Sequence, residues 1–241
     1  MSVNVNAPKD LPKGAMVIEA FPSRGYVSTL AANQLIKKLE MDMVGHIECD
    51  KLDAIAVVHD GQPLHPIRIY HKDNLIVIFS ELMIPFNLVH EFTAAIGDWF
   101  KELQPESAIL LASVPGVSTE KEHEIMNVST DEGMKKKLKK MKVKGMDEGV
   151  LTGMSSSLMI KCCAHDIPAT SLMVETSYIP DVLAAASLLE IIGGLLDMEI
   201  DVDELMEAGH EIEKKFKETL KQIHQGQENY HEIHQLQSMY R

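Results

Sequence analysis

Positive charge, and arginine above all, is scarce in this sequence. Only Arg24, Arg68 and Arg241 carry a guanidinium group, and Lys and Arg together number 23 against 36 Asp and Glu, for a formal net charge of −13. A protein that grips a nucleic-acid backbone needs clustered positive charge. The composition therefore argues against a nucleic-acid partner.

Cysteine is equally sparse, and its three positions have no repeated spacing. Cys49 stands alone and Cys162 and Cys163 are adjacent, which suits neither a disulfide framework nor a CxxC metal site. Of the eleven histidines, His59, His65 and His71 are scattered over a predicted hairpin without fixed partners, and His231 and His234 form a bare pair; no Gly-x-Ser-x-Gly elbow occurs. We expect reduced thiols in a cytoplasmic protein, no metal site and no serine-hydrolase triad.

Long hydrophobic runs are also missing. The longest, from Val182 to Leu196, spans about 15 residues and contains Glu190, whereas a membrane span needs roughly 20. Residues 1–13 lack the apolar core of a signal peptide. With 45% hydrophobic and 24% charged residues, we expect a folded globular protein that neither crosses a membrane nor is exported.

Strand and helix patterns alternate along the chain, which is typical of an α/β fold with a mixed sheet flanked by helices. Apolar or β-branched runs predict strands, and apolar spacing of three to four residues predicts helices. The expected strands cover residues 16–20, 43–49, 54–59, 67–70, 75–80, 107–114 and 169–175; the expected helices cover 27–39, 86–103, 155–164 and 181–196.

The chain divides into three parts. Residues 1–14 are expected to form a flexible N-terminus, and residues 15–200 one α/β domain. Residues 201–241 are expected to form a long C-terminal helix and a tail, because acids at 201–204 suit a helix N-terminus and an apolar stripe runs from Leu205 to Ile223.

A lysine-rich insert at 134–147 carries seven lysines, and no acid stands between Met134 and Lys144. Without these lysines the rest of the chain has 16 basic and 36 acidic residues, or −20, so the charge is segregated. Two interpretations remain open. The segment is either a solvated helix or self-repelling loop, or a cationic patch that docks an acidic surface, for example on a second copy of the chain. The lysines are 135, 136, 137, 139, 140, 142 and 144.

A glycine-rich turn precedes the helix expected at 155–164. Gly149 and Gly153, followed by Ser155, could present backbone N–H groups and hydroxyls to an anion. The turn lacks the Lys-Ser/Thr ending of a Walker loop and the spacing of a dinucleotide fingerprint. Close backbone packing with a helix cap is the alternative.

Polar residues fall near the predicted strand ends, where open α/β sheets often bind ligands. Arg24 and Gly25 follow the first predicted strand, while Arg68, Glu81 and Glu175 lie near others. The charged side chains among these could line a polar cleft, or they could form interface salt bridges. The pattern leaves both open.

The last three residues, Met239, Tyr240 and Arg241, place an apolar side chain, an aromatic ring with a hydroxyl and a carboxylate together. Recognition of a terminal carboxylate is a known mode of peptide binding, and an aromatic anchor beside it adds buried area. The pattern indicates a docking tail.

Eight short blocks of sequence follow one another along the chain: Phe21-Pro-Ser-Arg-Gly25, Asp60-Gly61, His65-Pro-Ile-Arg68, Ser80-Glu81, residues 149–159, Ile167-Pro-Ala169, Val174-Glu-Thr176 and Tyr178-Ile-Pro-Asp181. In this order they closely resemble the proteasome assembly chaperone family, particularly its archaeal members. The resemblance covers about residues 15–210.

The resemblance implies a fold like that of nucleoside phosphorylases, and a homo-oligomer. It also implies a role for the tail: archaeal relatives carry a hydrophobic-Tyr-any-residue ending that enters pockets between α subunits of the core proteasome, and Met239-Tyr240-Arg241 matches it position by position. A relation to ATP-grasp enzymes is not supported, since no glycine-rich phosphate loop or paired metal carboxylates occur. No cofactor is expected.

Three hypotheses follow. The first is a non-enzymatic chaperone or docking factor that binds α subunits through its tail. The second is an enzyme or small-molecule sensor that uses a phosphorylase-like cleft with Arg24, Arg68 and the turn from Gly149 to Ser157. The third is a scaffold that binds only itself.

Overall fold

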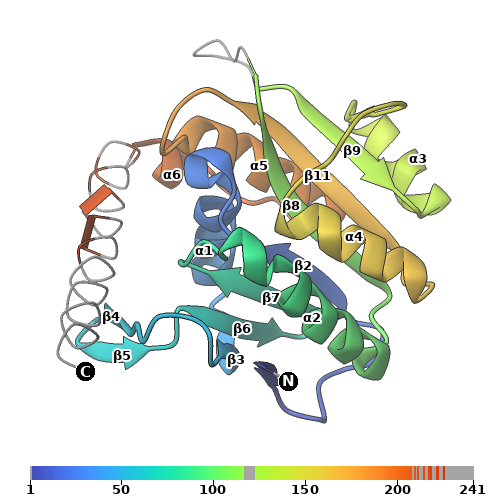
Figure 1. The fold of residues 1–241 in the computed structure, drawn as a ribbon. Helices are drawn as coiled ribbons and strands as arrows, with labels where there is room; N and C mark the ends of the chain where they lie inside the picture. The colour runs from blue at the N-terminus through green and yellow to red at the C-terminus, as the bar shows by residue number, and fades with distance from the viewer. Residues whose placement is uncertain are drawn as a thin grey trace, which may run out of the picture.

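A computed structural model describes residues 2–116 and 123–207, together with isolated positions between 209 and 225. Within these residues, nine strands form one sheet in the order β1-β3-β6-β7-β2-β8-β11-β9-β10 (Figure 1). The strands are β1 (Val3–Asn6), β2 (Met16–Ala20), β3 (Asp42–Cys49), β6 (Ile67–Lys72), β7 (Leu75–Ser80), β8 (Ser107–Pro115), β9 (Ile125–Ser129), β10 (Lys144–Gly145) and β11 (Ala169–Thr176).

The sheet is mixed, as the sequence predicts. Its four central strands, β7, β2, β8 and β11, are parallel to one another. Strands β6, β3 and β1 extend one side by antiparallel pairing, and β9 pairs antiparallel to β11 on the other. A separate hairpin joins β4 (Val57–His59) and β5 (Gln62–Leu64) through a turn at Asp60-Gly61.

Helices cover both faces of this sheet. Helices α1 (Val27–Lys38), α3 (Glu132–Lys140) and α5 (Val182–Leu195) share one hydrophobic core with the sheet, while α2 (Val89–Leu103) and α4 (Met154–Ala164) share the other. In Figure 1, α2 and α4 lie side by side over the nearer face. Successive strand residues alternate between the cores, as pleating requires: Val17 packs towards α2 and α4, and Ile18 towards α1 and α5.

The carboxyl ends of the four parallel strands lie along the same end of the sheet, which we call the carboxyl edge. The connections from β2 to α1, from β7 to α2 and from β11 to α5 leave from it. Helix α4 begins near it too, because Ser155 in its first turn bonds the backbone of β8. In open α/β sheets this edge is the usual place for ligand groups.

The expectation of a flexible N-terminus at residues 1–14 is wrong for its first half. Residues 3–6 form β1, which pairs with β3, and Val3 is buried in the same core as α2 and α4. Leu11 is buried there as well. The alternation Val3, Asn4, Val5 supplies one apolar and one polar face, which suits an edge strand over a half-covered sheet.

Two further segments refine the sequence-based expectations. The lysine-rich insert is ordered: Asp131 caps α3, its Oδ1 accepting a hydrogen bond from the Gly133 N–H at 2.7 Å, and β10 follows. The long C-terminal helix is described continuously only over α6 (Asp203–Glu207), so its remaining length stays a prediction. None of the helices in the described residues has the length and apolar character that crossing a membrane would require.

Candidate functional site

A buried carboxyl group lies near the carboxyl edge. Glu19, the fourth of five residues in β2, is fully buried. Its Oε1 accepts a hydrogen bond from the Phe21 N–H at 3.0 Å, and its Oε2 has no partner among the described residues. Burial raises the pKa of Glu19 to about 7, and contacts with the Ser155 hydroxyl and the Phe21 N–H offset this only in part. Glu19 was not predicted from the sequence as a site residue, although a single carboxylate within an otherwise apolar strand is a pattern that could have indicated it.

Two serine hydroxyls, one from α1 and one from α4, bind the same backbone carbonyl of β8. Ser155 Oγ donates to the Leu111 carbonyl at 2.9 Å, and Ser28 Oγ donates to the same oxygen at 3.2 Å. Ser23 Oγ lies 2.6 Å from Ser28 Oγ. These bonds hold the first turns of α1 and α4 against β8. Ser155, the predicted anion contact, therefore has a structural partner already.

The two glycines of the predicted turn lie in different settings. Gly153 has φ +92° directly before α4, and a Cβ there would meet open space. A Cβ on Gly149 would crowd the Met146 side chain. The positive φ at Gly153, which other residues rarely adopt, explains that glycine by conformation, and the anion-binding role of the turn stays a prediction.

Gly25 joins two connections at the carboxyl edge. Its φ is +68°, and its carbonyl accepts a hydrogen bond from the Asp181 N–H at 2.9 Å. A Cβ there would lie 2.9 Å from both Thr176 Oγ1 and the Tyr178 carbonyl oxygen. Asp181 in turn accepts from Thr176 Oγ1 at 2.5 Å and from the Ala184 N–H, capping α5. Gly25 thus fixes the β2–α1 connection against the β11–α5 connection.

Gly25→Ala is expected to destabilise the fold by roughly 2 kcal/mol, because a left-handed backbone and a tight contact coincide there. Gly61→Ala is the matched control: Gly61 has φ +75° with nothing within 4 Å of a Cβ, so only the backbone cost of about 1 kcal/mol applies. Urea unfolding of both variants measures the difference. Equal losses would contradict the role assigned to the contact.

Arg68 forms an internal ion pair rather than part of a cleft. Its side chain is almost wholly buried, with Nη2 at 2.6 Å from Glu81 Oε2 and the guanidinium carbon 5.1 Å from the centre of the Phe79 ring. His59 Nε2 lies 2.8 Å from the other Glu81 oxygen. The pair ties β6 to the end of β7.

The predicted cleft group is not gathered in one place. Strand β6, with Arg68, and strand β11, with Glu175, are four positions apart in the sheet, or about 19 Å at the usual strand spacing. Arg24 is exposed, and its carbonyl accepts a hydrogen bond from Ser113 Oγ at 2.6 Å. Glu175 packs beside Gly116 at the end of β8. The prediction of a single pocket lined by Arg24, Arg68 and Glu175 is therefore wrong. These residues all lie near the carboxyl edge, but the strand order separates Arg68 from Glu175.

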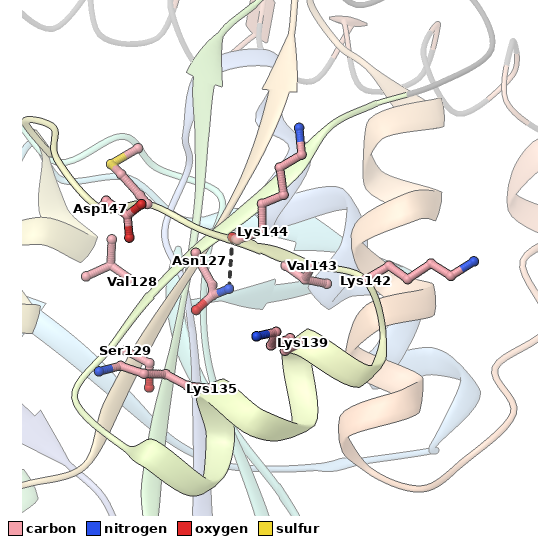
Figure 2. A pocket seen from close by; sticks show the side chains of 11 residues that line it. Asn127, Val128, Ser129, Lys135, Lys139, Lys142, Val143, Lys144 and Asp147 are labelled. Atoms are coloured by element: carbon pink, nitrogen blue, oxygen red, sulfur yellow. Dashed lines mark hydrogen bonds between the residues drawn. The ribbon is translucent and has the colours of Figure 1, made fainter.

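A cavity of about 780 Å³ lies away from this edge, between α3 and strands β9 and β10 (Figure 2). Four lysines of the lysine-rich segment line it, two from α3 and two from the connection into β10 and that strand itself. We call this cavity the lysine pocket. Its lysines are Lys135, Lys139, Lys142 and Lys144.

Large apolar side chains are exposed in connections at the carboxyl edge. Phe86 between β7 and α2 is 90% exposed, and Val150 before α4 is 87% exposed. Met83, Tyr178 and Ile179 are also at least half exposed. A partner that covers the carboxyl edge would bury these side chains together. The predicted docking tail, Met239-Tyr240-Arg241, lies outside the described residues.

The model of the PAC2 family matches residues 17–220 of this chain. The chain belongs to the PAC2 family. It is 30% identical over 208 residues, 86% of either chain, to "Uncharacterized protein MJ0106" of Methanocaldococcus jannaschii. The resemblance to proteasome assembly chaperones inferred from the sequence blocks is thereby confirmed at the level of the family.

Solved structures place this PAC2 chain beside two proteins of Pyrococcus furiosus. PbaA, described as an archaeal homolog of proteasome-assembly chaperone, is 28% identical, with 93% of this chain and 99% of that one aligned at a TM-score of 0.84. PbaB, described as an archaeal proteasome activator, shares the fold at 22% identity and a TM-score of 0.71, over 93% of this chain and all of that one. The mixed α/β fold is thus that of PAC2 proteins, while the likeness to nucleoside phosphorylases stays a prediction.

Proposed function

We propose that this PAC2 protein is a binding protein of the proteasome, an assembly chaperone or docking factor, and not an enzyme. The observation that carries the proposal is the match to PbaA over nearly the whole of both chains. PbaA is described as a homolog of proteasome-assembly chaperone, and the shared family extends through residues 17–220. Chaperone function needs a stable scaffold with exposed binding groups, which suits the internal use of Arg68 and Ser155.

The proposed contact is the C-terminal tail. Met239 and Tyr240 would enter a pocket between α subunits of the core proteasome, and the terminal carboxylate would pair with a lysine there. A single tail offers few anchors, so one such contact is weak. Several tails on one oligomer would multiply the affinity through high effective concentration.

Co-sedimentation of the untagged full chain with purified core proteasomes tests this function. We expect the chain to appear in the heavy fraction with core particles and to stay in the light fraction without them. Failure to co-sediment with core particles or with isolated α-rings would overturn the proposal.

Self-association is the second part of the proposal. The exposed apolar side chains at the carboxyl edge support a homo-oligomer, because burial of a large apolar side chain contributes roughly 1.5–3 kcal/mol. Phe86→Ser combined with Val150→Ser is expected to shift the chain towards monomer in sedimentation-velocity experiments. Val58→Ser, which changes an exposed residue on the β4–β5 hairpin, is the control. An unchanged oligomer in the double variant would contradict this placement of the interface.

An enzyme or small-molecule sensor is the alternative, and the observation that favours it is Glu19. A carboxyl group with a pKa about 7 and an unpaired oxygen, close to the carboxyl edge, is a common feature of ligand sites. Calorimetric titration with phosphate and nucleotides, repeated on Arg24→Ala, tests it. Binding that is lost in this variant would favour the sensor.

A further inference from the structure

The lysine pocket has the form of a ligand site rather than of a flat charged surface. Its volume of about 780 Å³ lies within the range of small-molecule pockets, roughly 300–1,000 Å³. Helix α3 forms one wall, and β9 with the connection through β10 forms the other (Figure 2). The pocket lies beyond β11 from Glu19 and Gly25, so it is distinct from the carboxyl-edge residues described above.

Positive charge around the pocket is only partly neutralised. Lys135 Nζ lies 2.6 Å from a Glu132 oxygen, and Lys144 pairs with Glu124, both at exposed positions. Lys139 and Lys142 have no ion pair among the residues that the structure describes. Asp147 is the one acidic residue among the described residues that line the pocket. The pocket therefore has a surplus of ammonium groups.

The helix sorts its lysines by face. Lys135 and Lys139 are four residues apart and so share one face of α3, which borders the pocket. Lys137 points elsewhere, because its Nζ donates to the Leu195 carbonyl at 2.9 Å and pairs with Asp197. Lys136 and Lys140 are exposed and do not line the pocket. Lys135 and Lys139 are thus the lysines of α3 that contribute charge to the pocket.

A polar group lies among these lysines. Asn127 on β9 is nearly buried, and its side-chain amide donates to the Lys144 carbonyl at 2.9 Å (Figure 2). The Asn127 backbone carbonyl accepts from the Met146 N–H at 2.9 Å, which holds the connection after β10 in place. These two bonds fix Asn127 and the connection after β10 relative to each other, so the wall of the pocket that carries Lys142 and Lys144 is held in place.

We propose that the lysine pocket binds a small anion carrying two or more phosphate groups. Lysine ammonium groups bind phosphate as compact point charges, and hydrogen bonds between charged partners are among the strongest in proteins. Lys135 and Lys139 extend from α3, whereas the side chains of Lys142 and Lys144 point away from α3 (Figure 2). Positive charge spread in this way around the pocket suits an extended polyanion better than a single phosphate. The concave shape favours a small ligand over the acidic surface of a protein. This inference goes beyond the proposed proteasome function.

Calorimetric titration of the full chain with inorganic tripolyphosphate and with ADP, at low ionic strength, tests the proposal. Lys135→Gln combined with Lys139→Gln removes two charges from the pocket face of α3. Lys136→Gln combined with Lys140→Gln removes two charges from the same helix outside the pocket. We expect the pocket pair to weaken binding about tenfold or more, as the loss of one charge-assisted hydrogen bond already would. The control pair should change binding by less than about twofold, through screened long-range charge alone.

Three outcomes would overturn the proposal. The first is the absence of binding by both phosphate probes. The second is an equal loss in the two double variants, which would show that the net charge of the helix and not the pocket is responsible. The third is binding of an octaglutamate peptide without binding of either phosphate, which would assign the lysines to an acidic protein partner. Circular dichroism of both double variants confirms that α3 and the fold persist.

Discussion

Removal of Tyr240 and Arg241 is expected to abolish co-sedimentation of this protein with core proteasomes. The truncation removes the aromatic anchor and moves the terminal carboxylate by two residues, so both groups that the proposed pocket would recognise are lost together. Because binding through several tails multiplies their separate contributions, a loss in every tail would be amplified in the proposed oligomer. Quantitative sedimentation with purified core particles measures the result.

Tyr230→Ala is a suitable control for the single change Tyr240→Ala. Both replace a tyrosine of the same C-terminal region by alanine, but Tyr230 lies ten residues before the proposed anchor. We expect Tyr240→Ala to lose most binding and Tyr230→Ala to retain it. A C-terminal extension moves the terminal carboxylate away from Tyr240, so we expect it to abolish binding as the truncation does. Undiminished binding after truncation would rule out the tail as the contact.

Glu19→Gln is expected to remove a pH dependence from the stability of the fold. The pKa of Glu19 is about 7 in the folded protein, against 4.5 for an ordinary glutamate, because the charged form is desolvated by burial. The folded state therefore holds the proton more tightly than the unfolded state. The contribution of Glu19 to the free energy of unfolding is therefore most favourable below pH 4.5, and it is lost as the pH rises towards 7.

The expected size of this effect is large for one side chain. The interval from 4.5 to about 7, at ~1.36 kcal/mol per pH unit, corresponds to about 3 kcal/mol. At pH 8, Glu19→Gln should therefore be more stable than the natural protein by up to about 3 kcal/mol, and the gain should vanish near pH 4.5. Urea unfolding at several pH values measures it. Glu102→Gln, at an exposed position of α2, is the control. A constant difference across this range would contradict the assignment.

The central layer of the fold could be predicted from sequence because its signals are local. Strands β2, β7, β8 and β11 each contain a run of three or more apolar residues, and the four longest helices that the structure describes carry their own apolar spacing. Strand β9 was missed, and β1 was taken for a flexible segment. Both depend on partners far along the chain: β1 is completed by β3, and β9 by β11. Their own residues are too few or too polar to show this pairing.

The candidate site was predicted less well, for a geometric reason. Sequence position correctly put Arg68 and Glu175 near strand ends, but their lateral separation depends on the strand order, which no local pattern contains. The partner of Ser155 is likewise decided by the packing of α4 on β8. Gly25 was placed at the right turn, whereas its contact with the Tyr178 carbonyl joins segments about 150 residues apart.

The sheet ends at β10, a strand of two residues that begins with Lys144 and lies beside the lysines of α3. An edge strand with unpaired backbone groups invites another chain to add a strand, and short, lysine-bearing edges prevent this. Two copies of the protein that approach each other through β10 would also bring their lysines together, and these like charges repel. The same lysines therefore disfavour open-ended, fibre-like growth of the sheet through β10, and the proposed self-association would use the apolar connections at the carboxyl edge instead.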